Sequence, residues 1–300
     1  MEAMLAQKRR VRCPVGAGMF YPEDKAEMQK KLKSFGLSSR KPKAAGKFDY
    51  ALDSGCKQRG LSGHAKAIIA PHGAWSYSGA LAASAFSSAM GRNIKSVVIL
   101  GPIHNNREKG LFLSNSHSFQ TPIGNILVDE KMTEEFEFSG ESFEINDIPH
   151  LGEHSIEILL PFVKFCFPNT PIVPILMGQP GAPYIYDLAQ ALKKVITPVF
   201  DETLIIVSSN LCSDDDEQNV MKAAGECIGL FAEKNAPALA SAILDGRLNA
   251  CGGALVVSLI ESGLLDGTSC SLVSNLVSSA STEDSAPENN IVYYGGLAYF

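Results

Sequence analysis

Short apolar runs alternate along the chain with longer segments of helical period. The apolar runs, which we expect to be buried strands, are 67–70, 97–100, 172–177, 204–208 and the aromatic, β-branched 291–300. The segments of helical period, which we expect to be helices, are 80–90, 155–167, 184–195, 217–234 and 252–263. This alternation is typical of a sheet covered by helices. It predicts an α/β fold, a three-layer domain with a mostly parallel sheet.

Residues that break the periodicity mark turns and loops. Pro161 lies inside one helical segment, so that helix should bend or start late. The sequence Thr121-Pro122-Ile123-Gly124 indicates a turn between two extended pieces. Segments 38–64 and 278–290 are polar with little periodicity, and we expect surface loops there. No repeat or sharp change in composition divides the chain, so residues 1–300 are predicted to form one domain.

Composition narrows the classes of partner. The chain has 26 basic and 32 acidic residues, a net charge of −6, and the acidic groups are spread out, which argues against nucleic acid. No apolar run approaches the roughly 18 residues that span a bilayer, so we expect no membrane partner. No apolar segment follows the basic N-terminus as in a secretory signal, and the seven cysteines lack CxxC spacing. A cytoplasmic protein with free thiols is the expectation.

Two histidines follow predicted strands directly. Strand 67–70 runs into Pro71-His72, and strand 97–100 runs into Gly101-Pro102-Ile103-His104. Ligands of open α/β sheets bind beyond the carboxyl ends of the strands. We therefore predict that His72 and His104 lie on neighbouring strands at one edge, where they could bind a metal, because neutral imidazole is the commonest metal ligand. Each histidine alone could equally be a loop residue bonded to a backbone carbonyl.

Other residues could complete a site with the two histidines. Cys251 stands before Gly252-Gly253 at a predicted helix start, where backbone N–H groups favour a thiolate, although a free cysteine is often a small buried hydrophobe. Glu153 and His154 are alternative ligands or catalytic groups. Ser155 could instead simply cap the next helix. Tyr77 could place its phenol over the crevice or form part of its wall.

Weaker signals have ordinary explanations. Residues 214–217 are all acidic and could bind a hard cation, but acidic residues at the start of a helix are usually a favourable solvated end. His64, His117 and His150 have no evident partner and are predicted at the surface. The sequence contains no P-loop, no GxGxxG after a strand and no GxSxG elbow, so nucleotide use and serine hydrolysis lack their usual signatures.

Taken in order, several motifs resemble the Memo family, the group that includes protein B of the AmmeMemoRadiSam system. They are Ala17-Gly18-Met19-Phe20-Tyr21-Pro22, Pro71-His72 to Gly79, Leu100-Gly101-Pro102-Ile103-His104, Thr121-Pro122-Ile123-Gly124, Glu153-His154-Ser155-Ile156-Glu157 with Leu160-Pro161, Ser208-Ser209 and Cys251-Gly252. With the final strand, they cover nearly the whole chain.

The resemblance implies a fold related to the LigB-type class III extradiol dioxygenases, which hold non-haem iron. It also implies a metal pocket of two histidines and a cysteine, here His72, His104 and Cys251, with iron or copper as the metal and zinc less favoured. Glu153 and His154 should lie close by. The chain departs from the family at Asn210 and Ser213, where relatives typically carry Asp and His. Neither the Asn210 amide nor the Ser213 hydroxyl transfers protons near neutral pH, which weakens the hypothesis that the protein is an enzyme.

Three functions follow from this sequence. The first is a binding or regulatory protein on a dioxygenase-derived fold, which holds a metal and a small-molecule or peptide ligand in the crevice and acts with protein partners. The second is an iron- or copper-dependent oxidoreductase, in which His154, Glu153 and Tyr77 would be the catalytic residues. The third is a metal-free scaffold. The sequence does not identify the ligand.

Overall fold

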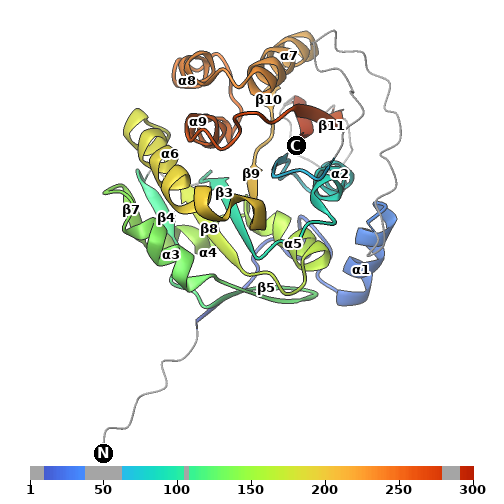
Figure 1. Cartoon of the computed structure of the whole chain (residues 1–300). Helices are drawn as coiled ribbons and strands as arrows, with labels where there is room; N and C mark the ends of the chain where they lie inside the picture. The colour runs from blue at the N-terminus through green and yellow to red at the C-terminus, as the bar shows by residue number, and fades with distance from the viewer. Residues whose placement is uncertain (1–9, 38–62, 105–107, 279–290) are drawn as a thin grey trace, which may run out of the picture.

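The computed structural model describes residues 10–37, 63–104, 108–278 and 291–300 (Figure 1). The loops predicted at 38–64 and 278–290 lie almost entirely outside the described residues.

Four parallel strands form the centre of a nine-stranded sheet. In spatial order they are β2 (Ala67–Ala70), β9 (Thr203–Ser208), β3 (Ser96–Pro102) and β8 (Ile172–Met177). Every residue of these strands is buried. Strands covered on both faces must be apolar throughout, which explains their continuous Ile, Leu and Val content.

The outer strands make the sheet mixed. On one side, β12 (Ile291–Tyr299) runs antiparallel to β2, and β10 (Cys212–Asp214) and β11 (Cys270–Ser278) both pair antiparallel with β12. On the other side, β4 (Leu111–Leu113) runs antiparallel to β8 and pairs with β7 (Phe143–Ile145). The predicted α/β fold is confirmed, and its parallel pairs lie within the central four strands and between β4 and β7.

Helices cover both faces of this sheet (Figure 1). Successive strand residues point to opposite sides, so Val98 belongs to one core cluster and Val97 to the other. One face carries α3 (Glu130–Glu137), α6 (Ala182–Ile196), α7 (Glu217–Glu233), α8 (Ala236–Leu244) and α9 (Gly253–Glu261). The other face carries α1 (Lys25–Ser34), α2 (Gly79–Ala89) and α5 (Leu160–Cys166).

The remaining elements are short. β1 (Val11–Arg12), β5 (Ser118–Thr121) and β6 (Gly124–Leu127) form a small second sheet, in which Thr121 to Gly124 makes the predicted turn. α4 (Ile148–Gly152) leads toward the site, and two 3₁₀ turns, η1 (Glu157–Leu159) and η2 (Thr197–Glu202), precede α5 and β9. The helix predicted at 155–167 therefore starts late, because Pro161 can occupy only a first turn.

None of the described helices combines the length and the apolar character needed to cross a membrane.

Candidate metal centre

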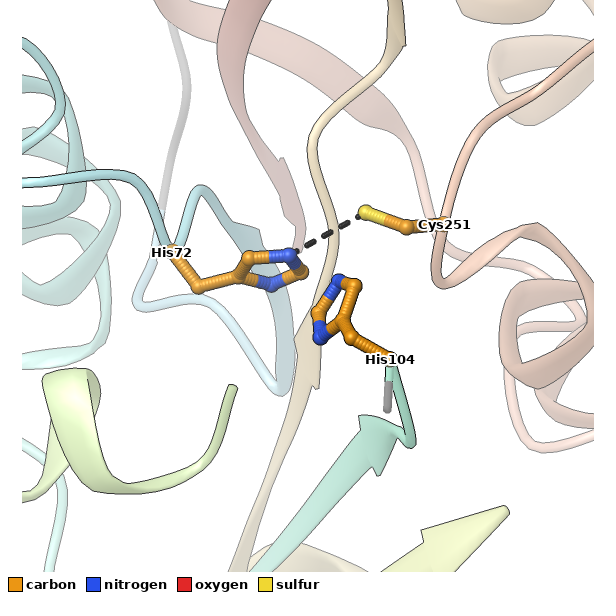
Figure 2. Close-up of side chains that lie close together, drawn as sticks. All are labelled: His72, His104 and Cys251. Atoms are coloured by element: carbon orange, nitrogen blue, oxygen red, sulfur yellow. Dashed lines mark hydrogen bonds between the residues drawn. The ribbon is translucent and has the colours of Figure 1, made fainter. Parts of the chain in front are cut away.

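His72, His104 and Cys251 converge from three distant segments of the chain (Figure 2). Their nearest ligand atoms all lie within 4.8 Å of one another. His72 Nε2 is 3.2 Å from Cys251 Sγ, and the two imidazole rings are 5.0 Å apart between centroids, at 76°. His72 is 2% exposed, and Cys251 is only partly buried, so the cluster opens to one side.

The ends of two parallel strands and the start of α9 place these side chains. His72 follows β2 and His104 follows β3, but the two strands are not neighbours, because β9 lies between them. The prediction of neighbouring strands was therefore wrong. Sequence order gave no sign that β9, which comes more than a hundred residues later, inserts between them. The parallel direction still brings both histidines to the same edge.

The start of α9 presses Cys251 against the end of β9. The N–H of Gly252, which caps this helix, donates to Ser209 Oγ at 2.9 Å. A Cβ at Gly252 would overlap the carbonyl oxygen of Ser208. The backbone N–H of Asn210 donates to Cys251 Sγ at 3.1 Å. Only glycine at position 252 permits this close approach of the helix to the strand. The helix begins directly after Gly252, close to the predicted start.

Glu153 holds His104 from behind. Its Oε1 accepts from His104 Nδ1 at 3.0 Å, and its Oε2 accepts from the His104 backbone N–H at 2.7 Å. Burial would raise the pKa of this carboxyl, but the hydrogen bonds from His104 lower it to about 2. A carboxylate that accepts from Nδ1 leaves Nε2 of the ring to face the pocket. Glu153 is thus placed to orient His104.

Ser155 does not cap a helix as the sequence allowed. Its hydroxyl donates to the carbonyl of Pro102 at 2.8 Å, and its N–H donates to Glu153 Oε1 at 2.8 Å. The turn that follows begins only at Glu157 and has no side-chain cap. Ser155 therefore ties its segment to the end of β3.

Electrostatics in the cluster favour a thiolate. Burial would raise the pKa of the Cys251 thiol, but the electrostatic effect of His72 and the hydrogen-bond contacts with His104 and His72 lower it to about 5. Burial would lower the pKa of His104, but hydrogen bonds to Cys251 and Glu153 raise it to about 10. Near neutral pH the sulfur is thus ionised and able to act as a ligand.

His154 lies beside the cluster, close to both histidine rings. The His154 ring stacks between Phe20, at 5.0 Å, and His104, at 4.8 Å between centroids. Burial lowers the pKa of His154, so this imidazole is neutral near pH 7. Tyr77 stacks against Tyr294, with 6.5 Å between the ring centroids.

The donor set suits a transition metal. Ligands at about 2.0 to 2.3 Å from one ion lie within about 4 Å of each other, close to the separations here. A thiolate with two imidazoles favours copper(I), iron(II) or zinc over magnesium or calcium. His104, Glu153 and His154 form a second close group, but Glu153 Oε1 already accepts from His104 and from two backbone N–H groups. The His72, His104 and Cys251 group therefore fits a metal better.

Sequence reasoning missed a buried ion pair that holds the N-terminal segment at the site. Glu157 accepts from the Arg12 guanidinium, the Tyr21 hydroxyl and the N–H groups of Val15 and Gly16. Burial would raise the pKa of Glu157, but the charge on Arg12 lowers it. A charged residue inside an apolar segment was the available signal, because a buried carboxylate needs a partner.

His150 is a correction to the sequence analysis, because it is buried and not at the surface. Only 2% of it is exposed, and its Nε2–H donates to the carbonyl of Phe112 at 3.1 Å. Burial lowers its pKa to about 4. His64 is exposed, and His117 is partly exposed beside Glu130.

The two departures from the family pattern have local partners. The side-chain oxygen of Asn210 accepts from the His72 backbone N–H at 3.1 Å. The N–H of Ser213 donates to Asn249 Oδ1 at 3.0 Å. In the acidic run, Asp216 caps α7 by accepting from the N–H groups of Gln218 and Asn219, which matches a solvated helix start.

Comparison with known proteins places the chain in a family. The family model for Memo-like proteins matches residues 12–298. A MEMO1 family protein of Methanothermobacter thermautotrophicus is 24% identical, over 96% of this chain and 100% of the relative. One of Thermotoga neapolitana is 28% identical, over 84% of this chain and 88% of the relative. The crystal structure of an uncharacterized protein from Escherichia coli K12 has a TM-score of 0.40 and 9% identity, covering 77% of this chain and 98% of that one. The match along nearly the whole chain means that this protein belongs to the Memo-like family.

Proposed function

We propose that this Memo-like protein binds one transition-metal ion through His72, His104 and Cys251 and works as a binding or regulatory protein. The observation that carries the proposal is the convergence of two imidazoles and a lowered-pKa thiol, within 4.8 Å, at one edge of the sheet. Neighbouring groups orient each donor, so little side-chain entropy is lost when an ion binds.

Iron or copper is the proposed metal, with zinc less favoured. The bound ion would supply a Lewis acid or a redox centre. The chain itself supplies the His72 ring, a His104 ring held by Glu153 and a thiolate. Beside them, Phe20 and His154 form an apolar and aromatic wall for a small-molecule or peptide ligand.

A binding role agrees with the groups around the cluster. Ser213 replaces a histidine of relatives, and its hydroxyl cannot move a proton near neutral pH. Glu153 is occupied with His104 and with backbone N–H groups. The pocket therefore offers few groups for acid–base chemistry.

One observation favours the second function, a metal-dependent oxidoreductase. His154 lies beside the cluster, with its ring 4.8 Å from His104 and 6.0 Å from His72 between centroids. Its lowered pKa keeps it neutral and able to accept a proton from a ligand. Tyr77 would then line the ligand pocket.

Metal analysis and oxygen uptake on the same preparations test both functions. Protein purified without chelator should carry about one equivalent of iron or copper, Cys13→Ser should match it because Cys13 is an exposed thiol, and Cys251→Ser should carry far less. Equal metal in Cys251→Ser, or no metal after reconstitution, would favour the metal-free scaffold. For a binding protein, iron-loaded protein with a catechol panel should consume no more oxygen than His72→Ala. Turnover above that variant would establish the oxidoreductase instead.

A further inference from the structure

Ser208 lies directly behind His72, at the last position of β9. Its Oγ is 2.7 Å from His72 Nδ1 and 2.7 Å from the carbonyl oxygen of Ser155. Ser208 is completely buried, so no solvent competes for these contacts. The strand that separates β2 from β3 therefore contributes a side chain to the site.

The direction of these hydrogen bonds follows from the chemistry of the groups. A carbonyl oxygen only accepts, so the single proton of the Ser208 hydroxyl is donated to Ser155. Ser208 Oγ must then accept from His72, which requires a proton on Nδ1. A neutral histidine that carries its proton on Nδ1 has its lone pair on Nε2. This is the atom that lies 3.2 Å from Cys251 Sγ.

We infer that Ser208 is a positioning residue that fixes His72 as the Nδ1–H tautomer and so makes Nε2 the metal ligand. The inference rests on the proposed metal-binding function. Without Ser208, the proton could move to Nε2 and donate to the thiolate, which would hide the lone pair on the far side of the ring.

The same short segment controls both histidines. Glu153 accepts from Nδ1 of His104, and two residues later the Ser155 carbonyl accepts from Ser208, which accepts from Nδ1 of His72. The Ser155 hydroxyl also bonds the carbonyl of Pro102, at the end of β3. Residues 153–155 therefore link the ends of the strands that carry the two imidazoles, and they set the same tautomer on both.

The test uses the full chain, zinc as the probe ion and nitrogen-15-labelled histidine. In metal-free wild-type protein, NMR should show the His72 proton on Nδ1 with slow exchange, because Ser208 holds it. In Ser208→Ala, that proton should exchange freely or move to Nε2, and the zinc Kd should rise by about 10- to 100-fold.

Ser258→Ala is the matched control. It also removes a fully buried hydroxyl that donates to a carbonyl, but this carbonyl belongs to Ala254 within α9 rather than to the segment behind His72. Its zinc Kd and its His72 signals should equal those of wild type. Thermal melts of both variants separate a loss of folding from a loss of the site.

Two results would overturn the role of Ser208. One is an Nε2–H tautomer of neutral His72 in metal-free wild type. The other is a Ser208→Ala protein that keeps the Nδ1–H signal and the wild-type zinc Kd. If wild type itself fails to bind zinc, iron or copper, the proposed metal-binding function fails, while the NMR tautomer still decides what Ser208 does.

Discussion

Glu153 is placed to act through His104, which it holds by two hydrogen bonds. Its carboxylate accepts from two atoms of His104 and from the N–H groups of His154 and Ser155. Because these bonds keep its pKa near 2, it stays ionised at any pH at which the protein is studied. A charged acceptor behind a metal-binding imidazole raises the basicity of the ligand.

Replacing Glu153 should therefore weaken metal binding. Glu153→Gln keeps the shape of the side chain but removes the charge, and we expect the Kd for zinc or iron to rise by about 10- to 100-fold. Isothermal titration measures this. Glu130→Gln is the control, because Glu130 makes a similar bond to His117, at 2.9 Å, outside the cluster. Equal losses in both variants would mean that the effect is general and does not pass through His104.

At the scale of elements, the site depends on the contact between the start of α9 and the end of β9. Gly252 allows this contact because its missing Cβ leaves room for the Ser208 carbonyl. Cys251 and Ser208 therefore reach the cluster from two elements that touch, and the position of the sulfur depends on how closely they pack.

Gly252→Ala should separate these two elements. The added methyl group must displace backbone, and overpacking of this kind costs about 1 to 3 kcal/mol of stability. The sulfur should also shift, so metal binding should weaken.

Gly225→Ala is the opposite case. Gly225 lies inside α7, and apart from its chain neighbours and the backbone of its own helix, no described atom lies within 4 Å of the position its Cβ would take. Alanine there should stabilise the fold by about 0.5 to 1 kcal/mol. Urea denaturation compares the two variants. A Gly252→Ala protein as stable as wild type would show that the helix can move away without cost.

For the whole molecule, a buried polar layer joins the N-terminal segment to α4 and the site. Arg12 donates to the carbonyls of His150 and Glu153 and pairs with Glu157. His150 lies within this layer, neutral and fully covered, with Asp147 and Glu153 as the nearby acidic groups and Arg12 as the nearby cation. Protonation of His150 is therefore linked to global stability.

The pKa of His150 is about 4 in the folded protein, because burial lowers it from its usual 6.5. The unfolded chain takes up this proton at higher pH than the folded chain does, so stability falls as pH falls from 6.5 toward 4. When the pH falls from about 7 to about 5, a range in which most carboxylates remain ionised, His150 should lower the free energy of unfolding by about 2 kcal/mol.

Chemical denaturation of metal-free protein at both pH values measures the loss. His150→Gln keeps a donor for the Phe112 carbonyl and does not titrate. Its free energy of unfolding should therefore fall by about 2 kcal/mol less than that of wild type over that pH interval. Cys251 and His104 are present in both proteins and cancel in the comparison. Identical pH profiles would show that His150 is protonated alike in the folded and unfolded chains.

Local patterns in the sequence were enough to predict the central strands, most of the helices and the two histidines that follow β2 and β3. They were enough because a buried parallel strand must be apolar throughout and because the carboxyl ends of parallel strands meet at one edge of the sheet, where ligands bind. Cys251 was also a candidate, from its place before two glycines at a helix start. These features depend on residues close together in the chain.

Tertiary structure alone decided which partners stand behind these residues. β9 inserts between β2 and β3, and only this insertion brings Ser208 to His72. Arg12 meets Glu157 across 145 positions of sequence, and it also donates to the backbone carbonyl of the buried His150. Strand order and hydrogen-bond partners depend on contacts between segments that are distant in the chain. The periodicity of apolar residues depends only on neighbouring positions, so it does not predict those contacts. The sequence by itself determined the candidate donor atoms, and the tertiary structure decided how each one is held.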